Sequence, residues 1–281
     1  MDLQRKKLVF LDIDGTLIPR SQKMSEKTIQ ALRQAHAGGH ILCICTGRTY
    51  CEMPEEMKKF DGIICAAGAC VMWKNRILLA HYFSDQEKKQ VMDLLEEADA
   101  VYTMEGFDDL YMKKENYESF VKRLDGCDEE EREILKLFER TCFCAEVEKM
   151  EKVHKCSYFY AGKEDEWFRE RLEKWGMGLA TFSQGDARGN SGEITKNTFT
   201  KGSAVRLLSE YLEIPIEDTI AIGDSENDLA MLRTAGIGIA MGNAFDYVKE
   251  GREGVAASMD GDGEYHAYRK DGLISKKLPN Q

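Results

Sequence analysis

Short, mostly apolar runs that end in Gly, Asp or Thr recur toward both ends of the chain. They cover residues 8–13, 41–45, 63–65, 219–222 and 237–241. Runs of this length and composition are typical of strands buried on both faces of a parallel sheet. Between the first two runs, apolar residues at helical spacing begin after Ser25 and stop at Gly38, residue types that favour the two ends of a helix. The pattern therefore predicts β–α–β units.

The middle of the chain has a different pattern. Helices are predicted over residues 84–95 and 164–175, the first with a capping box formed by Ser84 and Glu87. Strand-like alternation covers residues 101–111 and 153–160. A glycine-rich stretch, residues 185–192, is a candidate linker. These patterns predict one α/β domain built from residues 1–81 and 190–281, with an α+β domain of residues 82–189 inserted into it.

Charge and hydropathy narrow the class of partner. The chain has 39 basic and 50 acidic residues among 281, a formal net charge of −11. A negative field of this kind repels nucleic acid and anionic membranes, so neither is expected as a partner. A small anionic ligand would need a local cluster of cations or a bound metal ion. The longest charge-free apolar stretch, residues 62–73, falls short of the ~18 residues that a membrane helix needs.

The cysteines and the N-terminus indicate the compartment. Nine cysteines, an odd number without a C-x-x-C pair, fit reduced thiols better than a secreted disulfide framework. The apolar run after Lys7 is too short for a signal peptide. We therefore expect a cytoplasmic protein.

Two aspartates lie where the first predicted strand ends. In Asp12-Ile13-Asp14-Gly15-Thr16 the aspartates are two residues apart, so their side chains point the same way. The carboxyl end of a parallel strand is where α/β proteins bind ligands, and Gly15 lets the backbone turn there. A plain β-hairpin with an Asp-Gly turn is the structural alternative.

Three further polar segments follow predicted strands or open a helix. Thr46-Gly47-Arg48 follows the second strand, and by itself it is most simply a polar turn. Residues 223–228, Gly-Asp-Ser-Glu-Asn-Asp, form an acidic loop in which the capping-box spacing of Ser225 and Asp228 leaves Asp224 unexplained. Lys201 stands at a helix N-terminus, where the helix dipole disfavours a cation unless an anion is also present.

Together and in this order, the DxDGT, TGR, TKG and GDSEND segments resemble the motifs of the haloacid dehalogenase superfamily of phosphohydrolases. The resemblance implies a Rossmann-like, doubly wound parallel sheet, with the inserted domain similar to the α/β cap of the Cof-like subfamily. Glu193-Ile194 also looks like that subfamily. Residues 66–69 depart from it, because Ala67 stands in place of the usual asparagine, which puts one polar contact near the site in doubt.

The resemblance also implies roles for individual residues. Asp12 would be the nucleophile that forms an aspartyl-phosphate, and Asp14 the general acid and later the base. Mg²⁺ would be the cofactor. The implied metal ligands and supporting residues are Asp12, Asp14 through its carbonyl, Asp224 and Asp228. The implied phosphate-binding residues are Thr46, Gly47, Lys201 and Asn227.

The sequence therefore predicts a Mg²⁺-dependent phosphatase for small phosphorylated metabolites, with sugar phosphates as the favoured class and a cap that closes over the substrate. Dehalogenases of this superfamily lack the second aspartate, so Asp14 favours phosphate over halide chemistry. A phosphomutase and a non-catalytic phosphometabolite-binding protein are the two alternatives. The intact set of Asp12, Asp14, Lys201 and Asp224 disfavours the pure binder.

Overall fold

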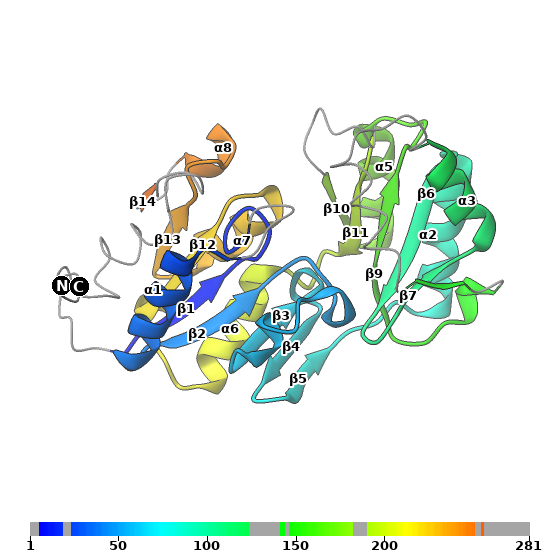
Figure 1. Cartoon of the computed structure of the whole chain (residues 1–281). Helices are drawn as coiled ribbons and strands as arrows, with labels where there is room; N and C mark the ends of the chain where they lie inside the picture. Colours follow the sequence, from blue (N-terminus) through cyan, green and yellow to red (C-terminus); the bar gives the residue numbers. More distant parts are fainter. Residues whose placement is uncertain are drawn as a thin grey trace. The chain divides into compact units, whose positions relative to one another are not determined.

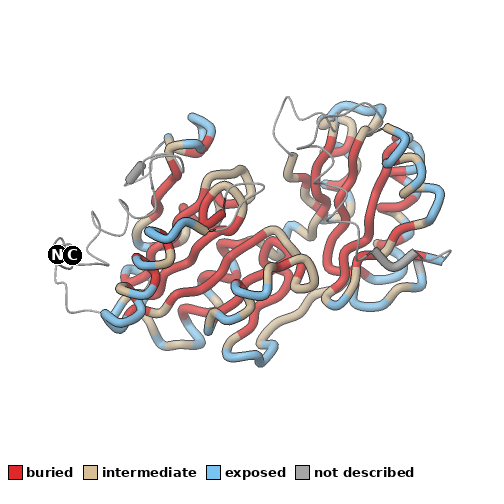
Figure 2. Tube along the Cα trace, in the orientation of Figure 1, coloured by how far each residue is buried: buried red, intermediate tan, exposed pale blue. Residues whose placement is uncertain are grey.

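The chain folds into two compact units. The computed structural model describes residues 6–18, 24–123, 141–143, 146–181, 190–250 and 254–255. Unit 1 comprises Met1–Gly47, Glu55–Leu79 and Thr200–Gln281, and unit 2 comprises Arg48–Pro54 and Ala80–Phe199. In both units most of the strands whose burial is described are buried along most of their length, with β5 as an exposed exception (Figures 1 and 2). None of the described helices is long and apolar enough to cross a membrane.

Unit 1 is built on an eight-stranded sheet with the order β14-β13-β12-β1-β2-β3-β4-β5. The strands are β1 (Leu8–Leu11), β2 (Ile41–Cys45), β3 (Gly62–Cys65), β4 (Cys70–Trp73), β5 (Arg76–Ala80), β12 (Thr219–Gly223), β13 (Ile237–Ala240) and β14 (Gly254–Val255). From β14 to β3 every neighbouring pair is parallel, and β3 and β4 are antiparallel. The predicted parallel sheet is confirmed, whereas β4 and β5 had no counterpart in the sequence pattern.

Helices pack against this sheet and supply much of its core. They are α1 (Glu26–Ala37), α6 (Lys201–Tyr211), α7 (Leu229–Thr234) and α8 (Asp246–Lys249). Ser25 caps α1 as predicted, because its hydroxyl accepts a hydrogen bond from the Thr28 N–H at 3.1 Å. Val205 and Leu208 of α6 lie in one apolar cluster with Phe10 of β1. This packing holds the middle of α6 against the central strand.

Unit 2 contains a six-stranded sheet with the order β10-β11-β9-β6-β7-β8. The strands are β6 (Val101–Gly106), β7 (Leu110–Met112), β8 (Thr141–Phe143), β9 (Val153–Phe159), β10 (Met177–Thr181) and β11 (Gly192–Lys196). The alternation over residues 101–111 therefore covers two strands, because the Gly106 N–H donates to the Asp109 carbonyl at 2.9 Å and closes a turn. Strand β11 pairs with β9 and β10, so unit 2 extends to Phe199; residues 182–189 lie outside the described part of the chain.

One face of the unit 2 sheet is covered by helices α2 (Asp85–Glu97) and α5 (Asp165–Leu172). Val91 of α2 and Phe168 of α5 pack in one cluster with Tyr102 and Tyr158 of the sheet. The capping box of Ser84 and Glu87 opens α2 as the sequence predicts. A third helix, α3 (Lys114–Arg123), packs through Phe120 in a separate cluster with other residues of β6 and β9.

Three charged side chains of the unit 2 sheet are buried. The Lys155 ammonium lies 2.7 Å from a Glu193 carboxylate oxygen and 3.0 Å from one of Glu105, and all three residues are at most 4% exposed. Burial, and then the charge of Glu52, raise the pKa of Glu105 to about 8, although Lys155 opposes the shift. Glu193, which together with Ile194 resembles the Cof-like subfamily in sequence, thus belongs to a buried polar cluster of unit 2.

The substitution Glu105→Gln is expected to flatten the fall in stability between pH 5 and pH 8. The folded protein binds a proton at Glu105 up to about pH 8, whereas an ordinary glutamate releases it near 4.5, so the parent loses stability as the pH rises through this window. Melting temperatures from pH 5 to pH 9 measure the effect. Glu87→Gln is the control, because the pKa of Glu87 is lowered and its titration lies below the window. Equal slopes for the parent and Glu105→Gln would contradict the assignment.

Candidate active site

Asp12 and Asp14 follow β1 at the carboxyl end of the sheet. The Asp12 N–H donates to the Ile222 carbonyl of β12 at 3.0 Å, and the residue is 3% exposed. Gly15 has a φ of +81°, and a Cβ atom there would lie 2.2 Å from an Asp224 carboxylate oxygen. Only glycine allows the turn to pass this close to Asp224. The loop after β1 is therefore fitted to the loop after β12, and no plain hairpin forms.

The loop after β12 is organised by Asp228. One of its carboxylate oxygens, Oδ2, accepts hydrogen bonds from the backbone N–H of Asp224 at 3.0 Å and of Ser225 at 2.9 Å. The Ser225 hydroxyl donates to the same oxygen at 3.0 Å, so the predicted capping box is present. The second oxygen, Oδ1, is left for a different partner. Asp228 thus shapes the loop and contributes a charge to the site.

Lys201 supplies that partner. It is the first residue of α6, is 1% exposed, and donates from Nζ to Asp228 Oδ1 at 2.6 Å and to Asp12 Oδ1 at 2.8 Å. Burial alone would lower the pKa of Lys201, but the two carboxylates raise it well above its ordinary value. The helix dipole disfavours a lysine at this end of α6, and the two carboxylates compensate for it.

The site concentrates negative charge. Burial, and then the charge of Asp228, raise the pKa of Asp12 well above its usual range against the opposing effect of Lys201. Burial and Asp228 likewise raise the pKa of Asp224 to about 7, and Asp14 contributes to both shifts. Carboxylate oxygens of Asp12, Asp224 and Asp228 lie within 4.8 Å of one another. This is an acidic group able to bind a metal ion, because a bound cation would relieve their mutual repulsion.

Thr46 follows β2, the neighbour of β1 in the sheet. The residue is 1% exposed; its N–H donates to the Ile64 carbonyl at 2.9 Å, and its carbonyl accepts from the Ala67 N–H at 3.1 Å. Gly47 is half-buried beside it. The register of β1 and β2 pairs Leu11 with Ile44, so the first residues after each strand lie at the same edge of the sheet. In this chain, Ala67 offers the site a backbone contact and only a methyl side chain.

Two asparagines flank the acidic loop. Asn227, predicted from its motif, has its side-chain oxygen 3.0 Å from the Ser225 hydroxyl, whose one proton it shares with Asp228 Oδ2. Asn243 was not singled out in the sequence. Its amide donates to the Gly15 carbonyl at 2.9 Å and lies 3.5 Å from Asp224 Oδ2. Its position two residues after the predicted strand 237–241 is the signal that would have identified it, because that strand ends at the same edge of the sheet.

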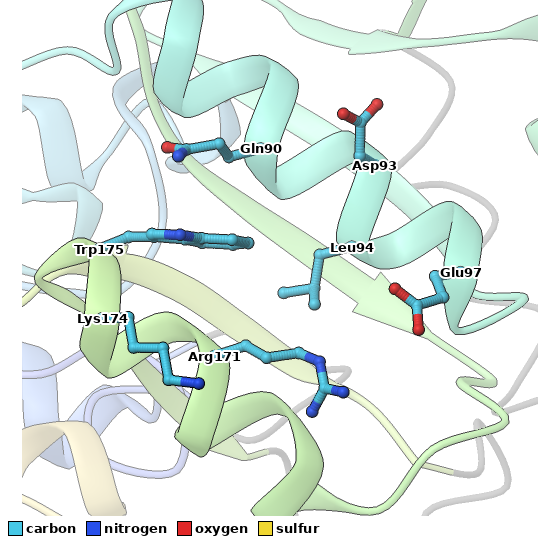
Figure 3. Close-up of a pocket in the computed structure, with 7 residues that line it drawn as sticks. All are labelled: Gln90, Asp93, Leu94, Glu97, Arg171, Lys174 and Trp175. Carbon is cyan, nitrogen blue, oxygen red and sulfur yellow. The ribbon is translucent and has the colours of Figure 1, made fainter.

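A surface hollow of unit 2 is separate from this group of residues. It has a volume of about 370 Å³ and lies between α2 on one side and, on the other, the end of α5 with the segment that follows it (Figure 3). The residues that line it are Gln90, Asp93, Leu94, Glu97, Arg171, Lys174 and Trp175. None of the predicted site residues lines this hollow.

The chain is similar to several known proteins. A family model of haloacid dehalogenase-like hydrolases matches residues 9–267. Phosphatase YwpJ of Bacillus subtilis (strain 168) is 27% identical, covering 92% of this chain and 98% of that protein. The 5-amino-6-(5-phospho-D-ribitylamino)uracil phosphatase YitU of the same organism is 27% identical, covering 91% and 94%. The solved sugar phosphatase BT4131, 24% identical, shares the fold with a TM-score of 0.78 over 96% of this chain and 100% of its own.

Replacement of Lys201 by methionine is expected to lower the free energy of unfolding by about 3–5 kcal/mol in the absence of metal, because two buried carboxylates then lose their counter-charge. Urea denaturation in EDTA measures the change. Lys89→Met is the control: its ion pair with Asp93 is 70% and 60% exposed, and its loss should cost less than about 1 kcal/mol. Similar losses in the two variants would show that the Lys201 pairs contribute no special stability.

Proposed function

The chain belongs to the family of haloacid dehalogenase-like hydrolases and is a phosphatase, and from that premise we propose that it hydrolyses phosphate monoesters of small metabolites with Mg²⁺ as its cofactor. One observation carries the proposal: the Lys201 ammonium lies between Asp12 and Asp228, beside Asp224, at the carboxyl edge of the sheet. A cation flanked by carboxylates, at the N-terminus of a helix, is suited to bind a phosphate beside a metal ion.

The donor set fits a hard divalent cation. Asp12, Asp224 and Asp228 offer only oxygen ligands, which Mg²⁺ prefers. The raised pKa values of Asp12 and Asp224 reflect burial first and then the neighbouring negative charge of Asp228, which such an ion would neutralise. These three carboxylates and the Asp14 carbonyl would hold the ion. When bound, Mg²⁺ supplies positive charge that stabilises the phosphoryl oxygens in the transition state.

The chain's own side chains account for the two chemical steps. A carboxylate oxygen of Asp12 attacks phosphorus; the bond from phosphorus to the ester oxygen breaks, and Asp14 donates a proton to the departing alcohol. Asp14, now ionised, takes a proton from water, whose oxygen attacks the same phosphorus and releases phosphate and the Asp12 carboxylate. Thr46, Gly47, Lys201 and Asn227 bind the phosphoryl oxygens and keep the group in line with Asp12.

We place sugar phosphates and sugar-alcohol phosphates first among substrates. The name of the relative YitU specifies a phosphoribityl compound, and a sugar phosphatase shares the fold. We also propose a cytoplasmic location, where such metabolites and reduced cysteines occur together.

The substitution Asp12→Asn is expected to abolish phosphate release while the protein stays folded. An amide oxygen is too weak a nucleophile to form the acyl phosphate, so the rate should fall by at least about a thousandfold. Phosphate release is measured from a panel of sugar phosphates, nucleotides and p-nitrophenyl phosphate, with Mg²⁺ and with EDTA. EDTA should remove the parent activity.

Asp218→Asn is the matched control. Asp218 is also a buried aspartate paired with a lysine, Lys7 at 2.7 Å, but it precedes β12 at the opposite edge of the sheet. Its replacement should change stability and leave kcat within a few-fold. Retained activity in Asp12→Asn would refute the nucleophile assignment. Isomerised sugar phosphate without free phosphate would indicate a phosphomutase, and ligand-induced thermal stabilisation without any turnover would indicate a binding protein.

A further inference from the structure

Building on the proposed function, we propose that the left-handed turn Ala66–Gly68 is a positioning element for phosphate binding. It holds the start of α6, and with it Lys201, at a fixed distance from Thr46. The family resemblance marks residues 66–69 only for a side-chain contact that Ala67 lacks, and the proposed mechanism uses no atom of this turn. Three observations carry the inference: its backbone conformation, its contacts on both sides, and the way in which its ends are fixed.

The backbone of the turn is unusual. Ala66, Ala67 and Gly68 have φ values of +50°, +54° and +105°, so three successive residues are left-handed and two of them carry a Cβ. Alanine rarely adopts this conformation, and it persists only where the surroundings impose it. Ala66 is fully buried and Ala67 is 7% exposed. Strain of this kind next to a functional site suggests that the site uses the resulting shape.

The turn contacts both phosphate-binding elements. On one side the Ala67 N–H donates to the Thr46 carbonyl at 3.1 Å. On the other side a Cβ atom on Gly68 would lie 2.4 Å from the carbonyl carbon and oxygen of Thr200 and 2.9 Å from the Lys201 nitrogen. The backbones of the turn and of α6 are therefore as close as glycine permits, and any larger residue at 68 must push one of them away.

The ends of the turn are fixed, so the start of α6 must move if the turn is enlarged. Cys65 and Cys70, both free thiols, face each other as backbone partners in the antiparallel pairing of β3 and β4, and the Ala69 N–H donates to the Ala66 carbonyl at 3.0 Å. Both strands belong to the central sheet. A side chain at 68 would therefore displace the Thr200–Lys201 backbone and lengthen the 2.6 Å and 2.8 Å contacts of the Lys201 ammonium.

Gly68→Ala tests this directly, with Gly39→Ala as its matched control. Gly39 is also left-handed, with a φ of +87°, but a Cβ there would meet nothing within 4 Å. Both variants place an alanine at a positive φ, which costs backbone strain, but only in Gly68→Ala would the new Cβ collide with the Thr200–Lys201 backbone. We expect kcat/KM for p-nitrophenyl phosphate to fall roughly 10- to 100-fold in Gly68→Ala, with weaker inhibition by inorganic phosphate, and to stay within a few-fold of the parent in Gly39→Ala. Equal kinetics in the two variants would overturn the proposal.

A second variant covers the case in which Gly68→Ala does not fold. Ala67→Gly keeps the Ala67 backbone contact and removes the left-handed penalty, so it should be at least as thermally stable as the parent. If the turn positions the phosphate site, its looser backbone should still weaken inhibition by inorganic phosphate a few-fold. Lys74→Gly is the control, because it relieves a φ of +47° in the exposed hairpin between β4 and β5. Higher stability with unchanged inhibition in Ala67→Gly would count against positioning.

Hydrogen exchange at backbone amides tests the contact between the turn and α6 independently of the proposed function. The N–H groups of Ser203 and Ala204 donate to the Thr200 hydroxyl and carbonyl, both at 3.1 Å. Displacement of Thr200 should speed their exchange in Gly68→Ala and leave it unchanged in Gly39→Ala. If the parent releases no phosphate, the proposed function fails, while this exchange difference still supports or refutes the contact. Unchanged exchange at both amides in Gly68→Ala would refute it.

Discussion

The Lys201 ammonium, 2.8 Å from Asp12 and 2.6 Å from Asp228, is the interaction on which the site depends. Without it, carboxylates would converge at the sheet edge with nothing but repulsion between them, in a place where water cannot screen the charges. Several local features serve this contact. The backbone bonds to Asp228 Oδ2 leave Oδ1 for the lysine, and the absence of a side chain at Gly15 lets Asp224 come close. Removing one partner of a buried ion pair is costly, but the intact pair is often no more stabilising than apolar residues of similar volume, so its presence here is better explained by function than by folding.

The geometry of a parallel sheet brings these residues together. Strands β1, β2 and β12 all end at one edge, so the segments that follow them meet there although they are far apart in sequence. Helix α6 supplies the cation at its first residue, and Val205 and Leu208 in the middle of the helix pack on the sheet. The site residues are therefore positioned precisely because they adjoin regular strands and helices, which hold side chains more firmly than free loops do.

Sequence patterns predicted those parts of the structure that depend on interactions between residues close together in the chain. The second strand, 41–45, and the caps at Ser25 and Ser84 lie where predicted, and the predicted fold class is confirmed. The motif residues lie together at one sheet edge, and their individual roles stay predictions. What the patterns missed depends on distant partners. Strands β4 and β5 have no clear alternation, the polar cluster around Lys155 forms only across three strands, and the left-handed alanines are imposed by their surroundings.

The order in which the ribosome makes these strands has its own consequence. Lys7 and Asp218, which begin the pairing of β1 with β12, are 211 residues apart. At about 5–20 residues per second, the central strand waits roughly 10–40 s for its neighbour to be synthesised. During that time the strand that pairs with β1 beside Asp12 is missing, and for most of it Lys201 has not yet been made. Most of unit 2 comes from the continuous segment Ala80–Phe199, so during translation its synthesis is complete before that of the unit that begins the chain.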